Sequence, residues 1–247
     1  MNVSLYQAAA AMNAQARWQE MISDNLASES VPGFRKQQIS FAAVAAGLDP
    51  TAGANNPGYV IPSASSSINF EPGELRATNN QMDFALEGPG FFEVQLPNGS
   101  HAYTRDGEFH LNASGQLVTK QGYLVLGDAG PLQFDLSDGG VVTVSPNGDV
   151  NLGPEVKGRL RLVEFSDPHK LTFTRQGFFL ADRPDAQPVA ASASLVRQGF
   201  LETSNTSPAA QMAGLILATR MFEANSKVLQ IQDERMGKVI SDLGNPS

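Results

Sequence analysis

Cysteine is absent from the 247-residue chain, which excludes disulfide bonds, thiolate nucleophiles and cysteine-based metal sites. Charged residues make up only 17% of the chain, below the usual quarter, whereas the apolar share of 41% is ordinary for a globular protein. The length suits one large domain or two smaller ones, each with a buried core. The composition therefore favours a globular chain with much packed surface.

Basic clusters, a signal peptide and long apolar runs are also missing. The net charge is -8, whereas a nucleic-acid binder needs clustered Lys and Arg to displace counterions from phosphates. The N-terminus lacks the basic region of a secretory signal, since its first cation is Arg17. No window reaches the roughly 18 apolar residues that a membrane span requires. We therefore expect no nucleic-acid partner, no cleaved signal and no membrane insertion.

Catalytic and ligand-binding motifs are scarce. The three histidines, His101, His110 and His169, do not fall in a spaced metal motif. Residues 88–90, Gly-Pro-Gly, do not precede a helix pattern, so a phosphate-binding loop is not predicted. No Gly-x-Ser-x-Gly sequence occurs. These absences predict no metal, no cofactor and no small-molecule substrate, and favour a protein that is not an enzyme.

The C-terminal stretch, residues 207–243, has the pattern of a long amphipathic helix. Ser207 can cap it, and Pro208 suits its first position. Steps of three and four residues give a ladder in which seven of the ten positions are apolar. It is made of Met212, Leu215, Thr219, Phe222, Ser226, Leu229, Asp233, Met236, Ile240 and Leu243. Further apolar residues lie beside this ladder. A helix lying across its own domain's core and a helix that binds other subunits both fit this pattern.

The N-terminal stretch predicts a second long helix, over residues 5–27. Ser4 and Gln7 can form a capping box at its start, and a turn at Pro32 and Gly33 follows its end. Its ladder has the same spacing and comprises Leu5, Ala8, Met12, Gln15, Gln19, Ile22 and Leu26. Because an isolated helix of this length is marginal in water, the two terminal helices can stabilise each other by pairing.

The middle of the chain has the signals of β-structure. Gly, Pro, Asn and Ser dominate residues 46–67, which we interpret as a linker. From residue 68 onward, short apolar runs alternate with turn residues, and Asn98-Gly99 between two such runs predicts a hairpin. We therefore predict an α+β fold with an antiparallel β domain, a sandwich or irregular barrel, inserted between the helices. The predicted parts are an N-terminal helical part (1–45), a linker (46–67), a β domain (68–203) and a C-terminal helical part (204–247).

Seven short stretches together resemble the flagellar basal-body rod and hook protein family. They are 22–27 and 32–35 at the N-terminal helix, 90–94, 103–107 and 115–119 in the β domain, and 198–205 and 220–227 at the C-terminal helix. The chain is short and has one β domain, which favours a rod protein over a hook protein. Residues 130–134 and 158–163 are most similar to the proximal-rod type, and residues 96–103 are also similar to the distal-rod type.

The resemblance implies a structural rod subunit that is exported by the flagellar type III apparatus and is needed for motility. It implies that the terminal helices pair as a coiled-coil-like α domain and that the subunit polymerises with copies of itself and other rod proteins in the basal body, within the periplasmic space. The predicted assembly interface comprises Leu5, Met12, Ile22, Asn25, Leu26, Met212, Leu215, Phe222, Leu229, Met236, Ile240 and Leu243.

A secreted β-fold carbohydrate-binding module or glycan-active enzyme is the alternative hypothesis. Its sugar site would combine Asp106 and Glu108 with the aromatic residues Phe91, Phe92 and Tyr103. Paired carboxylates can perform glycoside chemistry, although alternating residues at a β-turn usually face solvent. The structural hypothesis therefore predicts no active site, and the alternative predicts exposed aromatic rings beside two carboxylates.

Overall fold

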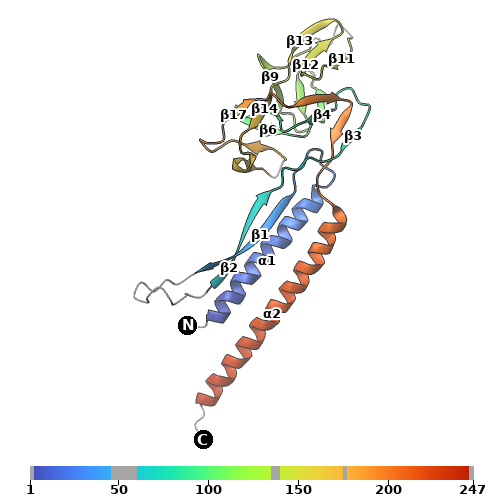
Figure 1. The fold of residues 1–247 in the computed structure, drawn as a ribbon. Helices are drawn as coiled ribbons and strands as arrows, with labels where there is room; N and C mark the ends of the chain where they lie inside the picture. The colour runs from blue at the N-terminus through green and yellow to red at the C-terminus, as the bar shows by residue number, and fades with distance from the viewer. Residues whose placement is uncertain (1–2, 46–59, 135–139, 175–176, 245–247) are drawn as a thin grey trace. The chain divides into compact units, whose positions relative to one another are not determined.

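The computed structural model describes residues 3–45, 60–134, 140–174 and 177–244. The fold is α+β, with an N-terminal helix, a central antiparallel β domain and a C-terminal helix (Figure 1), as the sequence predicts. The chain divides into two compact units. The α unit comprises Met1–Ala27, Gln37–Asn69 and Thr206–Ser247, and the β unit comprises Ser28–Lys36 and Phe70–Asn205.

The α unit contains two helices and one hairpin. Helix α1 is Val3–Ala27 and helix α2 is Pro208–Gly244, while strands β1 (Gln37–Ala45) and β2 (Val60–Ile68) form an antiparallel pair. Helix α2 begins at the predicted proline, and the Gln211 amide donates to the Ser207 carbonyl at 3.0 Å. The two helices lie side by side and antiparallel, with the hairpin against α1 (Figure 1).

The hairpin was not predicted, and it includes the last part of the predicted linker. Residues 60–67 belong to β2, while residues 46–59 lie outside the described residues. The Asn25 side chain joins the hairpin to α1. Its Nδ2 donates to the backbone carbonyl of Gln37 and its Oδ1 accepts from the backbone amide of Gln37, both at 2.8 Å. The Trp18 ring also meets Phe41 of β1 edge-on, with 5.7 Å between the ring centroids. Contacts with α1 thus order a serine- and alanine-rich hairpin.

The β unit is built from short antiparallel strands. Their bounds are β3 Leu75–Ala77, β4 Phe84–Glu87, β5 Phe91–Gln95, β6 His101–Thr104, β7 Phe109–Leu111, β8 Leu117–Thr119, β9 Leu124–Gly127, β10 Gly130–Pro131, β11 Val142–Val144, β12 Asp149–Leu152, β13 Glu155–Arg159, β14 Leu162–Phe165, β15 Thr172–Phe173, β16 Phe179–Leu180, β17 Pro188–Ala190, β18 Leu195–Gln198 and β19 Phe200–Glu202. A 3-10 helix covers Pro168–Lys170. The largest sheet among the described residues contains ten strands, ordered along its main path as β15-β16-β6-β5-β9-β8-β7.

The hairpin predicted at Asn98-Gly99 is confirmed. Strands β5 and β6 pair in antiparallel register from Phe92 opposite Thr104 to Gln95 opposite His101. Gly99 lies in the left-handed region, with φ of 81°, which a side-chain-bearing residue rarely adopts. The turn residues therefore set the register of these two strands.

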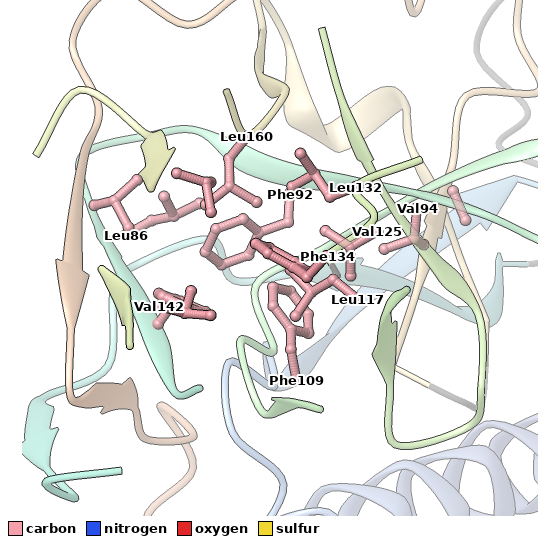
Figure 2. Packing of buried hydrophobic residues seen from close by; sticks show 14 of the residues in the cluster. Leu86, Phe92, Val94, Phe109, Leu117, Val125, Leu132, Phe134, Val142 and Leu160 are labelled. Carbon is pink, nitrogen blue, oxygen red and sulfur yellow. The ribbon is translucent and has the colours of Figure 1, made fainter. Parts of the chain in front are cut away.

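A large cluster of aliphatic and aromatic side chains is buried in the β unit. Phe92 lies at its centre and meets Phe109 edge-on, with the ring centroids 5.2 Å apart. Figure 2 shows these rings with Phe134, Leu117 and Val125 packed around them. Full burial of each large side chain contributes about 1.5–3 kcal/mol, so this cluster is a major source of stability in the β unit.

A buried carboxylate joins three distant segments of the β unit. Glu202 is 1% exposed, and its two oxygens contact Arg35 Nη1 at 2.6 Å and Arg105 Nη1 at 3.3 Å. The backbone amide of Gly73 also donates to Glu202 Oε1 at 2.8 Å. Arg105 donates to the Gly88 carbonyl at 2.6 Å, and burial lowers its pKa to about 10. The single negative charge of Glu202 thus compensates part of the positive charge of two buried guanidinium groups.

Candidate assembly surface

One face of α2 packs against α1 within the α unit. We call Leu215, Ala218, Phe222, Asn225 and Leu229 the inner seam, because they are all at least partly buried and follow steps of three and four residues. Leu215 and Ala218 belong to a cluster with Met21 and Ile22 of α1. Further along, the Asn225 side chain donates to Gln15 Oε1 at 3.1 Å. These contacts place the inner seam against α1.

A second apolar line on α2 is exposed. We call Leu217, Met221, Ala224, Val228 and Ile231 the outer stripe, and the four larger side chains are 52%, 44%, 46% and 56% exposed, respectively. Each of the first four stripe residues immediately precedes an inner-seam residue in the sequence. Because successive residues of an α-helix are about 100° apart, the two lines are separated by about that angle around the helix. The stripe has the spacing of a helix-packing surface without a partner in the described structure. It is therefore the candidate assembly surface.

The predicted interface residues on α2 fall into three groups. Leu215, Phe222 and Leu229 lie in the inner seam, and Met212 and Met236 are exposed. The side chains of Ile240 and Leu243 lie outside the described residues. Between residues 215 and 229, every second residue of the predicted ladder thus belongs to the inner seam. At the positions between them, the residues that face α1 are Ala218 and Asn225, whereas the ladder predicted Thr219 and Ser226.

The predicted interface residues on α1 lie mostly within the chain's own packing. Ile22 is buried beside Ala218, and Asn25 is fully buried where it holds the hairpin. Met12 and Leu26 are half-buried, while the side chain of Leu5 lies outside the described residues. The sequence pattern did not single out the outer stripe as a separate surface. The signal was present, since its five residues have three-four spacing of their own.

The carbohydrate-site hypothesis is wrong about its aromatic residues. Phe91, Phe92 and Tyr103 are 2%, 0% and 4% exposed, so their rings have no free face on which a sugar could stack. Asp106 is partly buried and accepts a hydrogen bond from the Glu108 amide at 3.0 Å, which stabilises a turn. Sequence reasoning failed here because aromatic residues in a strand look the same whether one face or both faces of the sheet are covered.

The buried turn at Asp106 predicts a pH-dependent stability. Burial raises the pKa of Asp106 from 3.8 to about 6. Between these values the folded state binds more protons than the unfolded state, so this stabilising contribution is complete below the unfolded pKa and is lost as pH rises through about 6. We expect Asp106→Asn to raise the free energy of unfolding near neutral pH by up to about 3 kcal/mol.

Urea unfolding of the two proteins at about pH 5 and about pH 7.5 measures this effect. The difference between Asp106→Asn and the native chain should grow with pH, because only the native chain must ionise this partly buried carboxyl group. The exposed Asp128 provides a control, and Asp128→Asn should follow the native chain. A loss of stability in Asp106→Asn at both pH values would contradict the assignment.

The described residues form neither a metal site nor a membrane-spanning helix that would indicate another function. No group of three or more His, Asp or Glu side chains there could hold a metal ion. His101 instead contacts Glu93 Oε1 through Nδ1 at 2.5 Å, and Arg161 contacts the other carboxylate oxygen at 2.7 Å. In the same described part of the chain, neither helix has a stretch both long and apolar enough for a bilayer crossing. The outer stripe remains the principal candidate surface.

Comparison with known proteins identifies the family. Residues 85–152 match the flagellar hook protein FlgE/F/G D1 domain, and residues 197–243 match the flagellar basal body rod FlgEFG protein C-terminal family. The flagellar basal-body rod protein FlgG of Borreliella burgdorferi is 32% identical over 256 residues, covering 95% of this chain and 96% of that protein. The chain belongs to the flagellar basal-body rod protein family.

Other rod proteins show similar likeness. The flagellar basal-body rod protein FlgF of Escherichia coli is 31% identical over 250 residues, with 96% of this chain and 97% of that protein covered. The FlgF protein of Rhizobium meliloti is 30% identical over 252 residues, with 99% of both chains covered. FlgG and FlgF proteins thus both align with almost the whole chain at nearly equal sequence identity. The preference for a proximal over a distal rod type stays a prediction.

Proposed function

We propose that this protein is a structural, non-enzymatic subunit of the flagellar basal-body rod that assembles with copies of itself and with other rod proteins through its terminal helices. The observation that carries the proposal is the outer stripe of α2. From Leu217 to Ile231 it spans about 21 Å of helix at 1.5 Å per residue. Full-length similarity to named rod proteins supports the same conclusion.

Hydrophobic burial supplies the driving force for this assembly. The inner seam already uses the contact with α1, so the outer stripe exposes apolar area that water solvates unfavourably. A helix from another subunit placed on the stripe would bury that area in a coiled-coil-like packing. The proposal thus gives the two lines on α2 different roles, one within the chain and one between chains.

The predicted interface residues fit this division of roles. Ile22, Leu215, Phe222 and Leu229 hold the helix pair together, and this pair presents the stripe. Met212 and Met236 are exposed on α2, but they lie off the stripe, because Met212 is seven residues before Thr219 and Met236 is seven residues after Leu229. We propose that the first group is required for assembly indirectly, and that the stripe itself makes the contact between subunits.

Export and location follow from family membership as part of the proposal. The subunit would be exported by the flagellar type III apparatus and would assemble in the periplasmic part of the basal body. Motility would depend on it. An unassembled subunit would keep the outer stripe in water, which favours its incorporation into the rod.

Two aspartates in the outer stripe should abolish assembly. We expect Met221→Asp combined with Val228→Asp to raise the concentration needed for self-association by at least about 100-fold, because two apolar side chains no longer gain burial and two charges must be desolvated. Sedimentation velocity over a concentration series measures association. Circular dichroism tests whether α2 remains folded, as expected for two exposed positions.

A matched control places the same charges elsewhere on α2. Thr219 and Gln230 are exposed and lie away from the stripe, so Thr219→Asp with Gln230→Asp should associate like the native chain. Complementation of a non-motile deletion strain provides a second measurement, in which only the stripe variant should fail to restore swimming. Normal association and swimming of the stripe variant would refute the proposed surface.

A further inference from the structure

A pair of amides, Gln15 buried and Asn225 partly buried, interrupts the packing between α1 and α2. Gln15 is 5% exposed, and its side-chain carbonyl accepts the hydrogen bond from Asn225 Nδ2 at 3.1 Å. Apolar contacts lie to one side of this pair, where Ile22 meets Ala218. Two amides within a helix interface are unusual, since aliphatic residues would gain more from burial there.

The contacts define one antiparallel register. Going seven residues back along α1, from Ile22 to Gln15, corresponds to seven residues forward along α2, from Ala218 to Asn225. Seven residues are close to two helical turns, so the same faces of both helices meet at both points. The helices thus match in steps of one heptad, and a slip of one heptad would preserve which faces meet.

Either heptad slip would separate the two amides. A slip in one direction places Asn225 opposite Ile22, and a slip in the other direction places it opposite Ala8, which is itself buried. In both cases the Asn225 amide faces an apolar side chain, and a buried unsatisfied polar group carries a large penalty. Apolar contacts alone would discriminate weakly, because hydrophobic burial is not directional.

We propose that the Gln15–Asn225 hydrogen bond determines the register of the α1–α2 pair. The bond acts mainly against the slipped arrangements and adds little net stability to the native one. The outer stripe contains no polar residue, so it does not impose a register on a helix that binds it. This inference concerns packing within one chain and stands independently of the proposed assembly.

Cysteine cross-linking can read the register, because the native chain contains no cysteine. A side chain added at Gly214 would lie 3.3 Å from Ile22 Cδ1, so Ile22→Cys with Gly214→Cys reports the native register. Ile22→Cys with Met221→Cys reports the slip that places Asn225 near position 22. Both pairs are introduced into the native chain and into the Gln15→Leu, Asn225→Leu double variant. Mass spectrometry of the oxidised monomer then identifies disulfides formed within one chain.

We expect the slipped disulfide to increase at least about 10-fold in the double leucine variant, while the native chain forms the native disulfide. The single variants Gln15→Leu and Asn225→Leu should each lower the melting temperature of the α unit by about 2–10 °C, because one buried amide loses its partner. The double variant should recover this loss. Fluorescence of Trp18, the single tryptophan of the chain, monitors that unit.

A control separates register from added hydrophobicity. Asn13→Leu with Gln230→Leu makes the same chemical change at exposed positions of the same helices. The inference is overturned if this control increases the slipped disulfide as much as the buried double variant does. It is also overturned if the buried double variant forms the native disulfide alone, since the register would then be set by other contacts.

Discussion

Replacing Glu202 with alanine is expected to lower the free energy of unfolding of the β unit by about 3–5 kcal/mol. The carboxylate is buried between Arg35 and Arg105, and its removal leaves two buried cations without their counter-charge. The amide of Gly73 loses its acceptor as well. Glu202→Gln should be less severe, because the amide oxygen can still accept that hydrogen bond.

Amide hydrogen exchange is the appropriate measurement, because Trp18 fluorescence reports on the other unit. The amides of Val94 and Val125, which are completely buried in the β core, should exchange faster as opening becomes less costly. Glu87→Ala is the matched control, since Glu87 pairs with Arg197 at 2.8 Å on the surface. An exposed pair contributes about 0–1 kcal/mol. Equal effects of the two substitutions would show that the buried network is not stabilising.

The second large effect concerns where the β unit begins. We expect a protein made of residues 28–36, a short glycine-serine linker and residues 70–205 to fold, and a protein made of residues 70–205 alone to be largely unfolded. Residues 28–36 carry Arg35, whose loss leaves Glu202 and Arg105 unbalanced. They also supply the Gly33 amide, which donates to the Glu202 carbonyl at 2.7 Å, and the buried Phe34 ring.

The linker can be short because Gln37 and Ile68 are paired across the β1–β2 hairpin. Removing the hairpin therefore leaves two chain ends that are close together. Thermal unfolding followed by near-ultraviolet circular dichroism compares the two proteins, and a cooperative transition should occur only in the longer one. A cooperative transition of similar midpoint in both would place the boundary of the β unit at residue 70.

The elements that the sequence predicts well are those determined by neighbouring residues. The proline at position 208 and the three-four apolar spacing predict α2, and Asn98-Gly99 predicts the β5–β6 hairpin. The resemblance of short motifs also leads to the right family. In these cases the physical cause of the structure lies within a few residues of its effect.

The features that the sequence does not reveal depend on contacts between distant residues. The β1–β2 hairpin requires Asn25 to satisfy the backbone of Gln37, and its serine-rich strands look like a linker in isolation. Apolar residues are so frequent on α2 that more than one three-four ladder can be drawn, and the contact with α1 selects the inner seam. The same excess of apolar residues forms the outer stripe.

The hydrogen bond between Gln15 and Asn225 also has an evolutionary consequence. It connects two positions that are 210 residues apart in the chain, so a substitution at one position leaves the amide at the other without its partner unless that residue changes as well. The outer stripe has no such pairwise constraint, and its apolar residues can be exchanged for one another singly. Selection would thus act jointly on the pair that we propose fixes the register and residue by residue on the candidate assembly surface.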